Sequence, residues 1–241
     1  MRRPLKHEPM TIAPLQFFGL GDIIFCQTLA REWINAGHKV VWGTMDYLVE
    51  GLQRAYPDVA FVDYKTLPID YMRQDEHDSN GYRVIPLRWN VEIMKVPYTR
   101  CMETKYTMFG MDWHRWREGA MWVRDFKKEQ ELKNLLSIKD GDKYNLVSTT
   151  FGTGMKHKVP IVVNNAYRNI DLQYIPGYSL FDWAGVFEQA TTIHVVSSSN
   201  IYIMEMLDLQ ADEIKLYLRK PIESNHDNYN YLLERHNYTF E

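Results

Sequence analysis

The stretch that decides the fold is residues 17–33, FFGLGDIIFCQTLAREW. The apolar run that leads into it predicts a β-strand, and this strand ends at a Gly-Leu-Gly turn. The acid Asp22 then opens an apolar pattern with helical spacing, which predicts a helix capped by Asp22 and ended by Gly37. Strand, glycine turn and amphipathic helix together predict the first unit of a parallel α/β sheet.

Outward from this stretch, strands and helices alternate with short links in both halves of the chain. This alternation predicts an α/β fold built of two doubly wound, Rossmann-like halves. The polar segment KDGDK predicts a domain boundary, with residues 1–139 forming a domain with a helical middle and residues 140–241 a domain with a C-terminal helix. The predicted strands are 11–18, 38–44, 58–64, 82–89, 144–150, 159–165, 191–198 and 213–220. The predicted helical segments are 22–36, 46–56, 98–136, 179–190 and 199–209, and residues 223–238 are predicted to form a polar helix or tail.

The composition is that of an ordinary globular protein. The 241 residues carry a formal net charge of −3, with 45% hydrophobic and 24% charged residues. No apolar run approaches the roughly 20 residues of a membrane span, and the basic N-terminus is not followed by the apolar segment of a secretory signal. The two cysteines, Cys26 and Cys101, are predicted to be buried free thiols in a reducing compartment. We therefore expect a cytoplasmic protein without a membrane span.

The first glycine turn has more than one interpretation. A dinucleotide-binding turn requires a third glycine at position 24, where this chain has Ile24, and this argues against NAD or FAD. Asp22 is either a helix cap or a general base, and its charge would weaken phosphate binding at the same turn. The turn therefore favours an acceptor site, formed by Gly19 and Gly21, with Asp22 as its base.

Two loops of the second half are predicted to bind a diphosphate. The loop after residue 148 combines hydroxyls, glycines and cations, which suit a diphosphate as well as they suit a solvated lysine loop. A serine tract at the end of a buried strand opens the next helix without an acid nearby, so its N–H groups favour an anion. The predicted donor-binding residues are Thr150, Gly152, Thr153, Lys156, Lys158, Ser197, Ser198, Ser199 and Asn200.

The middle of the chain is rich in arginine and tryptophan. Residues 82–128 hold six Arg and four Lys against five acids, and four of the seven Trp. Such a segment either binds a sugar, a phosphorylated acceptor or single-stranded nucleic acid, or is an amphipathic helix with its Trp in the core. The predicted acceptor-binding residues here are Arg88, Trp89, Trp113 and Arg115. The cysteine and histidine spacing predicts no zinc site, and Asp140-Gly141-Asp142 is predicted to be a turn, so we expect no metal.

Three motifs together resemble the heptosyltransferase-like GT-B glycosyltransferases of family nine. GLGDIIFCQTLAREW resembles the opening of that family, in which a Gly-Asp pair precedes the first helix. SLFDWAGVFEQATTIHVVSSSNIYIMEML resembles its C-terminal signature of helix, apolar strand and small-residue turn. GMKHKVP resembles its lysine-bearing loop, with Val159 where the family has Trp. The family's Asp-Ser-Gly-Pro turn is replaced in part, since Ser197 stands for Asp and Ser199-Asn200 for Gly-Pro.

The resemblance implies a compact GT-B fold, with two Rossmann-like halves facing across a cleft. It implies a hexosyl- or heptosyltransferase that uses a nucleoside-diphosphate sugar as substrate, inverts the anomeric centre and needs no metal or other cofactor. Asp22 would be the base, and Lys156 or Lys158 would neutralise the donor phosphates. The acceptor would be a glycan, a lipid-linked sugar or a modified nucleic acid.

Two other classes of function remain open from the residues alone. One is a nucleotide-sugar or NAD-dependent oxidoreductase or epimerase, for which Tyr217 and Lys220 are one residue too close to form the catalytic Tyr-x-x-x-Lys pair. The other is a non-catalytic protein that binds sugar or nucleic acid, for which the Arg/Trp segment is the support.

Overall fold

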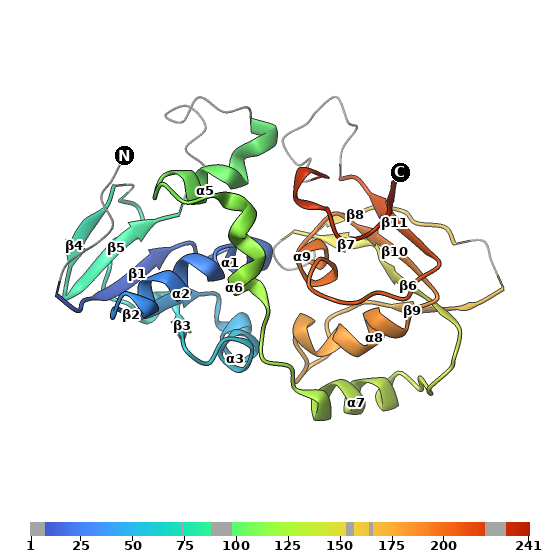
Figure 1. Cartoon of the computed structure of the whole chain (residues 1–241). Coiled ribbons are helices and arrows are strands. Elements are labelled where there is room, and N and C mark those ends of the chain that lie inside the picture. The colour runs from blue at the N-terminus through green and yellow to red at the C-terminus, as the bar shows by residue number, and fades with distance from the viewer. Residues whose placement is uncertain (1–7, 74, 88–97, 153–156, 164–165, 220–229) are drawn as a thin grey trace. The chain divides into compact units, whose positions relative to one another are not determined.

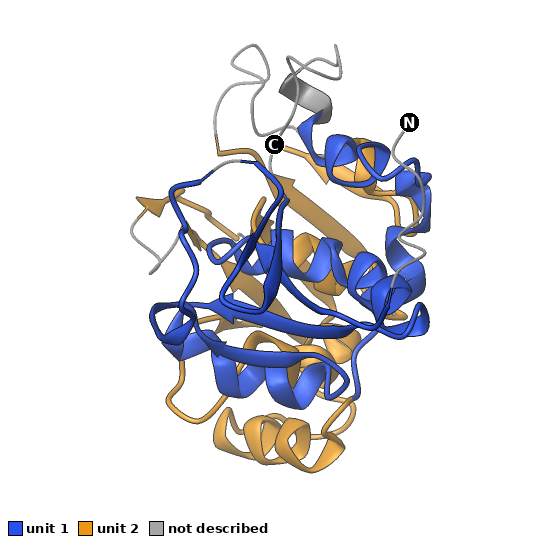
Figure 2. Cartoon of the chain, turned by 90° about the vertical axis from the view of Figure 1, so that its left-hand side faces the viewer, with its two compact units in different colours: residues 1–123 blue, residues 124–241 orange. Residues whose placement is uncertain are grey.

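The computed structural model describes residues 8–73, 75–87, 98–152, 157–163, 166–219 and 230–241. Their contacts divide the chain into two compact units, residues 1–123 and 124–241 (Figure 2). The predicted boundary at residues 139/140 lies after this division, because helix α7 (Phe126–Leu135) packs on α8 (Ala184–Gln189) of the second unit. Among the described residues, no helix combines the length and the apolar character needed to cross a bilayer.

The first unit is built on a five-stranded sheet with the order β3-β2-β1-β5-β4 (Figure 1). All neighbouring strands are parallel except β4 and β5. Val84 of β5 packs with Ala13 and Leu15 of β1 in one buried cluster of this sheet. The strands are β1 (Thr11–Leu15), β2 (Lys39–Thr44), β3 (Ala60–Asp63), β4 (His77–Ser79) and β5 (Tyr82–Pro86).

The helix after β1 begins earlier than predicted and is divided in two. Helix α1 (Leu20–Phe25) has Gly19 as its N-cap residue, so Asp22 lies inside the first turn and the prediction that Asp22 is the cap was wrong. Helix α2 (Gln27–Asn35) follows after Cys26. Gly37, at φ 89°, ends α2 as predicted, because a positive φ is readily adopted by glycine.

Short helices form the rest of the first unit. Helix α3 (Asp46–Ala55) links β2 to β3. The segment after residue 98 forms the 3₁₀ turns η2 (Tyr98–Glu103) and η3 (Trp113–Arg115) and helices α5 (Thr104–Thr107) and α6 (Trp116–Ala120). Helix α6 approaches α2 so closely that a Cβ on Gly119 would lie 2.5 Å from the Cα of Thr28, and the Gly119 N–H donates to Thr28 Oγ1 at 2.7 Å.

The second unit has an all-parallel sheet with the order β12-β11-β10-β6-β9. The two parallel sheets and their helices confirm the predicted α/β class. The segment 184–189 forms α8, preceded by the 3₁₀ turn η4 (Leu180–Trp183), and α9 (Asn200–Met204) follows β10. The strands are β6 (Tyr144–Ser148), β9 (Arg168–Asp171), β10 (Thr192–Val196), β11 (Glu213–Tyr217) and β12 (Tyr238–Phe240), beside the hairpin of β7 (Thr150–Phe151) and β8 (His157–Lys158).

Two edge strands of this sheet differ from the prediction. The strand predicted at 159–165 is absent over residues 159–163, where Val162 is 83% exposed, and residues 164–165 lie outside the described part. Strand β9 takes the edge instead, and β12 lies at the opposite edge, where a polar helix or tail was predicted. Glu205 anchors the segment before β12, since its buried carboxylate accepts bonds from the Glu234 N–H and the Tyr238 hydroxyl.

Candidate active site

The strand order of the first sheet locates a candidate site. From β1 the chain adds β2 and β3 on one side and later β5 on the other, so the order reverses between β1 and β5. Open α/β sheets bind ligands at the carboxyl ends of the strands beside such a reversal. Gln16 follows β1 there and Leu87 follows β5. Asp22, at the start of α1, lies at the same edge because α1 begins four residues after Gln16.

An ion pair joins the parts of this edge. The Lys105 ammonium on α5 lies 3.0 Å from Asp22 Oδ1, and it donates to Gln16 Oε1 and to the Leu87 carbonyl, each at 2.7 Å. The Lys105 side chain is fully buried, whereas the Asp22 side chain is 25% exposed. The buried cation therefore has an acceptor for each of its three N–H groups, and the acid it holds remains open to solvent. Lys105 and Gln16 were absent from the predicted site.

Gly19 leaves space for the Asp22 carboxylate. Gly19 has φ 77°, and a Cβ at this position would lie 2.5 Å from Asp22 Oδ2. A larger residue would therefore be strained by its backbone and would also collide with the acid. Gly21, in contrast, is buried within α1. The structure thus brings Gly19 into contact with the Asp22 carboxylate and gives Gly21 a place in the helix.

Aromatic side chains surround the ends of the first three strands. Phe17 stacks on Tyr64 with ring centroids 4.8 Å apart and meets Tyr71 edge-on at 5.1 Å. Phe18 is 44% exposed, and its carbonyl accepts a bond of 2.6 Å from Gln16 Nε2. Burial raises the pKa of the Tyr71 hydroxyl, which donates to the Tyr64 carbonyl. Phe18 thus presents an exposed ring directly before the Gly19 turn, and a sugar ring can stack on such a surface.

The two thiols near this ion pair are inert. Cys26 and Cys101 are free and buried, as predicted. Desolvation by burial raises the pKa of each thiol to about 12, although the positive charge of Lys105 opposes the rise. Both thiols therefore stay protonated at neutral pH, so neither supplies a thiolate nucleophile.

The Arg/Trp segment has a packing explanation where it is described. Trp113 is buried at 7% exposure, and Trp116 and Trp122 are buried as well. Arg115 forms ion pairs of 2.8 Å with both Glu32 of α2 and Glu118 of α6. The structure therefore gives these side chains a packing role, since Trp113 is buried and Arg115 ties α6 to α2. Arg88 and Trp89 lie outside the described residues.

The second sheet has its own reversal of strand order. Strand β6 has β9 on one side and β10 on the other, and the serine tract follows β10 at its carboxyl end. Asn200 is buried and its Nδ2 donates to Ser148 Oγ, at the end of β6, at 3.0 Å. Ser197 is also buried, and its N–H donates to the Tyr217 carbonyl at 2.8 Å. Ser197 and Asn200 thus hold the turn together, and Ser198 and Ser199 are its partly exposed members.

The lysine-bearing loop is a short hairpin at the same edge. Thr150 pairs with Lys158 across β7 and β8, and Lys158 is exposed. Gly152, at φ 82°, forms the bend after β7. Thr153 and Lys156 lie outside the described residues. The hairpin therefore places Thr150, Gly152 and Lys158 near one another.

Arg219 is a cation that the sequence prediction missed. It follows β11, its Nε donates to the Ser197 carbonyl, and its guanidinium lies 5.2 Å from the centroid of the Phe151 ring. Phe151 in turn stacks on His157 at 5.2 Å. Contacts across the sheet thus add a positive charge to the serine tract and the hairpin. In the sequence Arg219 lay inside the predicted strand 213–220, and the observed strand β11 ends at Tyr217, so no sequence signal marked it as a site residue.

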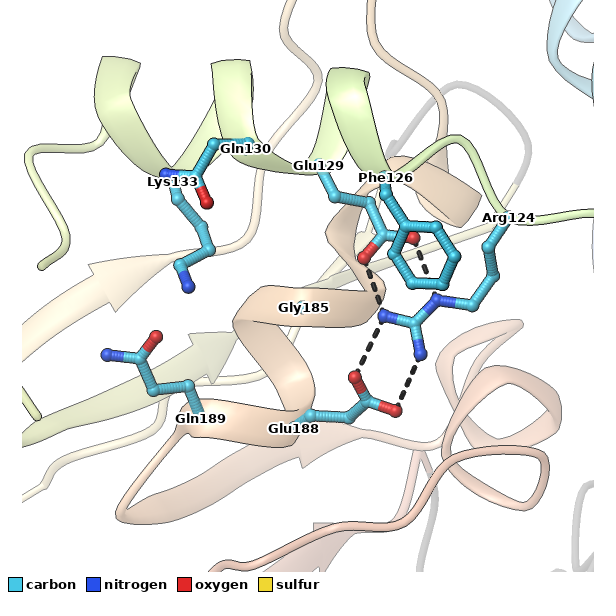
Figure 3. A pocket seen from close by; sticks show the side chains of 8 residues that line it. All are labelled: Arg124, Phe126, Glu129, Gln130, Lys133, Gly185, Glu188 and Gln189. Atoms are coloured by element: carbon cyan, nitrogen blue, oxygen red, sulfur yellow. Dashed lines mark hydrogen bonds and ion pairs between the residues drawn. The ribbon is translucent and has the colours of Figure 1, made fainter. Parts of the chain in front are cut away.

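A cavity of about 430 Å³ lies elsewhere in the second unit, between α7 and α8 (Figure 3). The Arg124 guanidinium lines one side of the cavity and bonds Glu129 at 2.6 Å and Glu188 at 2.8 Å. One positive charge is thus shared by two carboxylates. The end of α8 precedes β10, so this cavity lies toward the amino end of that strand, whereas the serine tract lies at its carboxyl end.

No metal-binding cluster is found among the described residues, taken as groups of three or more His, Cys, Asp or Glu. Asp140 pairs with Lys133 at 3.1 Å, and Asp142 Oδ2 accepts a bond of 2.8 Å from the Lys139 N–H. Gly141 between them has φ 83°. The Asp140–Asp142 segment is therefore the predicted turn.

Comparison with known proteins gives a likeness of fold. No protein-family model and no curated protein sequence matches the chain. Its structure is similar to that of the glycosyl transferase family 9 protein from Veillonella parvula DSM 2008, with a TM-score of 0.52 and 9% identity over 99% of this chain and 89% of that one. It is also similar to the iron-containing dodecameric glycosyltransferase TibC from enterotoxigenic E. coli H10407, with a TM-score of 0.48 and 11% identity over 89% of this chain and 59% of TibC.

The chain thus matches 59% of the length of TibC. The likeness to the Veillonella protein confirms that the fold resembles that of family nine, as predicted from the three motifs.

Proposed function

We propose that the chain is a glycosyltransferase that moves a sugar from a nucleoside-diphosphate sugar to an acceptor hydroxyl. The observation that carries the proposal is the carboxylate of Asp22, held by Lys105 at the reversal of strand order in the first sheet. Ligands of open α/β sheets bind at this position, so an acid held there can reach a bound substrate. The likeness of fold to a family 9 glycosyl transferase supports the same class of reaction.

Asp22 is the general base of this proposal. Its ionised carboxylate would take the proton of the acceptor hydroxyl as the oxygen attacks the anomeric carbon of the donor. The C–O bond to the diphosphate breaks as the new glycosidic bond forms, and a single displacement of this kind inverts the anomeric centre. The exposed ring of Phe18, next to the same turn, would stack against the acceptor sugar.

The second unit would bind the donor. Lys158 on the hairpin and Arg219 beside the serine tract would neutralise the charge that develops on the departing nucleoside diphosphate. Thr150, Ser198 and Ser199, which are partly exposed at this edge, would donate hydrogen bonds to phosphate oxygens. Ser197 and Asn200 would act through the shape of the turn, since both are buried. Side-chain cations supply the positive charge, so the proposal includes no metal and no cofactor.

The alternative functions have less support. A dinucleotide would require its pyrophosphate at the first glycine turn, where the Asp22 carboxylate would repel it and where Ile24 is fully buried in place of a third glycine. A role in binding nucleic acid was motivated by the Arg/Trp segment, whose described Trp residues are buried.

A screen of donors tests the proposal. The thermal midpoint would be measured with UDP-, ADP-, GDP- and CMP-sugars, and with NAD and the free sugars as controls. We expect one of the UDP-, ADP- or GDP-sugars to raise the midpoint and to be hydrolysed slowly to its nucleoside diphosphate, because water can replace the acceptor; stabilisation by a CMP-sugar alone, which releases a nucleoside monophosphate, would contradict a diphosphate donor. Stabilisation by NAD alone, with none by any sugar nucleotide, would overturn the proposal in favour of an oxidoreductase.

A further inference from the structure

We propose that Lys105 is a positioning residue for the transfer reaction, which orients Asp22 so that Oδ2 is the atom that accepts the proton. The inference rests on the proposed function and assigns a reaction role to a residue outside the predicted site. Lys105 is fully buried and lies 3.0 Å from Asp22 Oδ1, so it acts on substrate only through the acid.

The geometry around the ammonium leaves it little freedom. Lys105 has three N–H donors and three acceptors within 3.0 Å: Asp22 Oδ1, Gln16 Oε1 and the Leu87 carbonyl. The last two acceptors come from the residues that directly follow β1 and β5, so the cation is held at the carboxyl edge of the sheet. Because the cation is held at the sheet edge, the carboxylate that pairs with it also has a fixed position relative to that edge.

The second carboxylate oxygen lies beside Gly19. Oδ2 points toward Gly19, where a Cβ would lie 2.5 Å away, and the absence of that Cβ leaves the oxygen space for a hydroxyl. Lys105 contacts Oδ1 and Gly19 lies beside Oδ2, so the two carboxylate oxygens have different roles. One oxygen fixes the orientation, and the other is left to receive the proton.

A kinetic double-mutant cycle tests this role. Nucleoside diphosphate release from the sugar nucleotides of the donor screen would be measured for wild type, Lys105→Met, Asp22→Asn and the double variant. We expect Lys105→Met to lower kcat by about 10²-fold with the donor KM changed less than about twofold, because only the base is misplaced. In the Asp22→Asn background the same substitution is expected to change kcat less than about twofold. If the losses in kcat caused by the two substitutions multiplied in the double variant, as independent effects do, the proposal would be overturned.

Two further variants complete the design. Lys105→Gln retains two N–H donors without the charge, and it replaces Lys105→Met if that variant does not fold. Lys39→Met, at the exposed amino end of β2, is the matched control and is expected to retain wild-type activity.

Crystal structures supply a readout that does not depend on turnover. In Lys105→Met we expect the Asp22 carboxylate to leave its wild-type rotamer while β1 and β5 keep their places. An unchanged rotamer would overturn the positioning role even in an active enzyme. If the wild-type protein acts on none of the sugar nucleotides, the proposed function fails, whereas the rotamer still decides whether Lys105 orients Asp22.

Discussion

The Lys105 ammonium lies 3.0 Å from the Asp22 carboxylate, and the lysine is fully buried while the aspartate is 25% exposed. A buried lysine is costly unless its charge is paired, so this contact fixes a functional group at the edge of the sheet where ligands bind. The pair distinguishes this turn from a nucleotide-phosphate cradle, because its outward-facing charge is negative. Asp22 is therefore the central residue of the proposed mechanism.

Replacement of Gly19 by alanine tests the room around Asp22. Gly19→Ala places a Cβ 2.5 Å from Asp22 Oδ2 and also forces a non-glycine residue to φ 77°. We expect a loss of about 1–3 kcal/mol in the free energy of unfolding, together with reduced activity. Thermal denaturation and product release measure the two effects.

The matched control for that variant is Gly37→Ala. Gly37 has a similar φ of 89°, but its Cβ would meet nothing within 4 Å. We expect this variant to lose about 1 kcal/mol of stability and to keep its activity. Equal effects of the two substitutions on activity would contradict a contact between residue 19 and the acid.

His194 makes the stability of the second unit depend on pH. Its side chain lies in β10, with Nε2 3.9 Å from Glu213 and 3.1 Å from Thr192 Oγ1. Burial lowers the pKa of His194 from its ordinary value of 6.5, although Glu213 opposes this shift and Lys215 adds to it. The unfolded chain therefore binds the proton more readily, so the contribution of His194 to stability is complete above about pH 6.5 and decreases as the pH falls below it.

Thermal midpoints of wild type and His194→Gln from about pH 7.5 to about pH 5 check this effect. The wild-type midpoint is expected to fall more steeply below about pH 6.5 than that of the variant, which cannot bind the proton. Parallel curves for the two proteins would show that His194 does not titrate differently on folding.

Arg219 is expected to act on donor binding. Because its guanidinium lies beside Ser197 and Phe151, Arg219→Ala should remove a charge-assisted bond to the donor phosphates. We expect the donor KM to rise roughly 10- to 100-fold with a smaller change in kcat. Arg168→Ala is the control, since Arg168 contacts Asp142 at the amino end of β9. An equal rise in KM for both variants would contradict a specific role for Arg219.

The sequence allowed the central strands to be predicted because they are buried on both faces and appear as apolar runs. The edge strands of the second sheet were harder to predict from the sequence. Strand β9 buries Ile170 alone among its four residues, and β12 is largely exposed. Neither strand therefore shows the alternation of apolar and polar residues by which a strand is predicted. The apolar segment 159–163 was mistaken for a strand, because an apolar run alone does not reveal whether it has a neighbour to pair with.

The candidate site was predicted in part for a related reason. Asp22 and the serine tract follow strands directly, so local sequence indicated their edge of each sheet. Lys105 lies 89 residues from Gln16 in the chain, and its bond to that side chain exists only after folding. The helix start also shifted, because the positive φ of Gly19 allows α1 to begin before the acid that resembled its cap. The part of the site formed by Lys105 thus depends on contacts between distant segments, which the periodicity of the sequence does not reveal.

The most direct test of the account is the rate of glycosyl transfer by Asp22→Asn. With a donor identified by the screen, we expect the rate of nucleoside diphosphate release to fall by about 10²- to 10⁴-fold while donor binding is retained, because the variant lacks a proton acceptor. Asp46→Asn, which changes an exposed acid in the first turn of α3, is the control and should keep the wild-type rate. A folded Asp22→Asn protein that releases nucleoside diphosphate at the wild-type rate would contradict the assignment of Asp22 as the base.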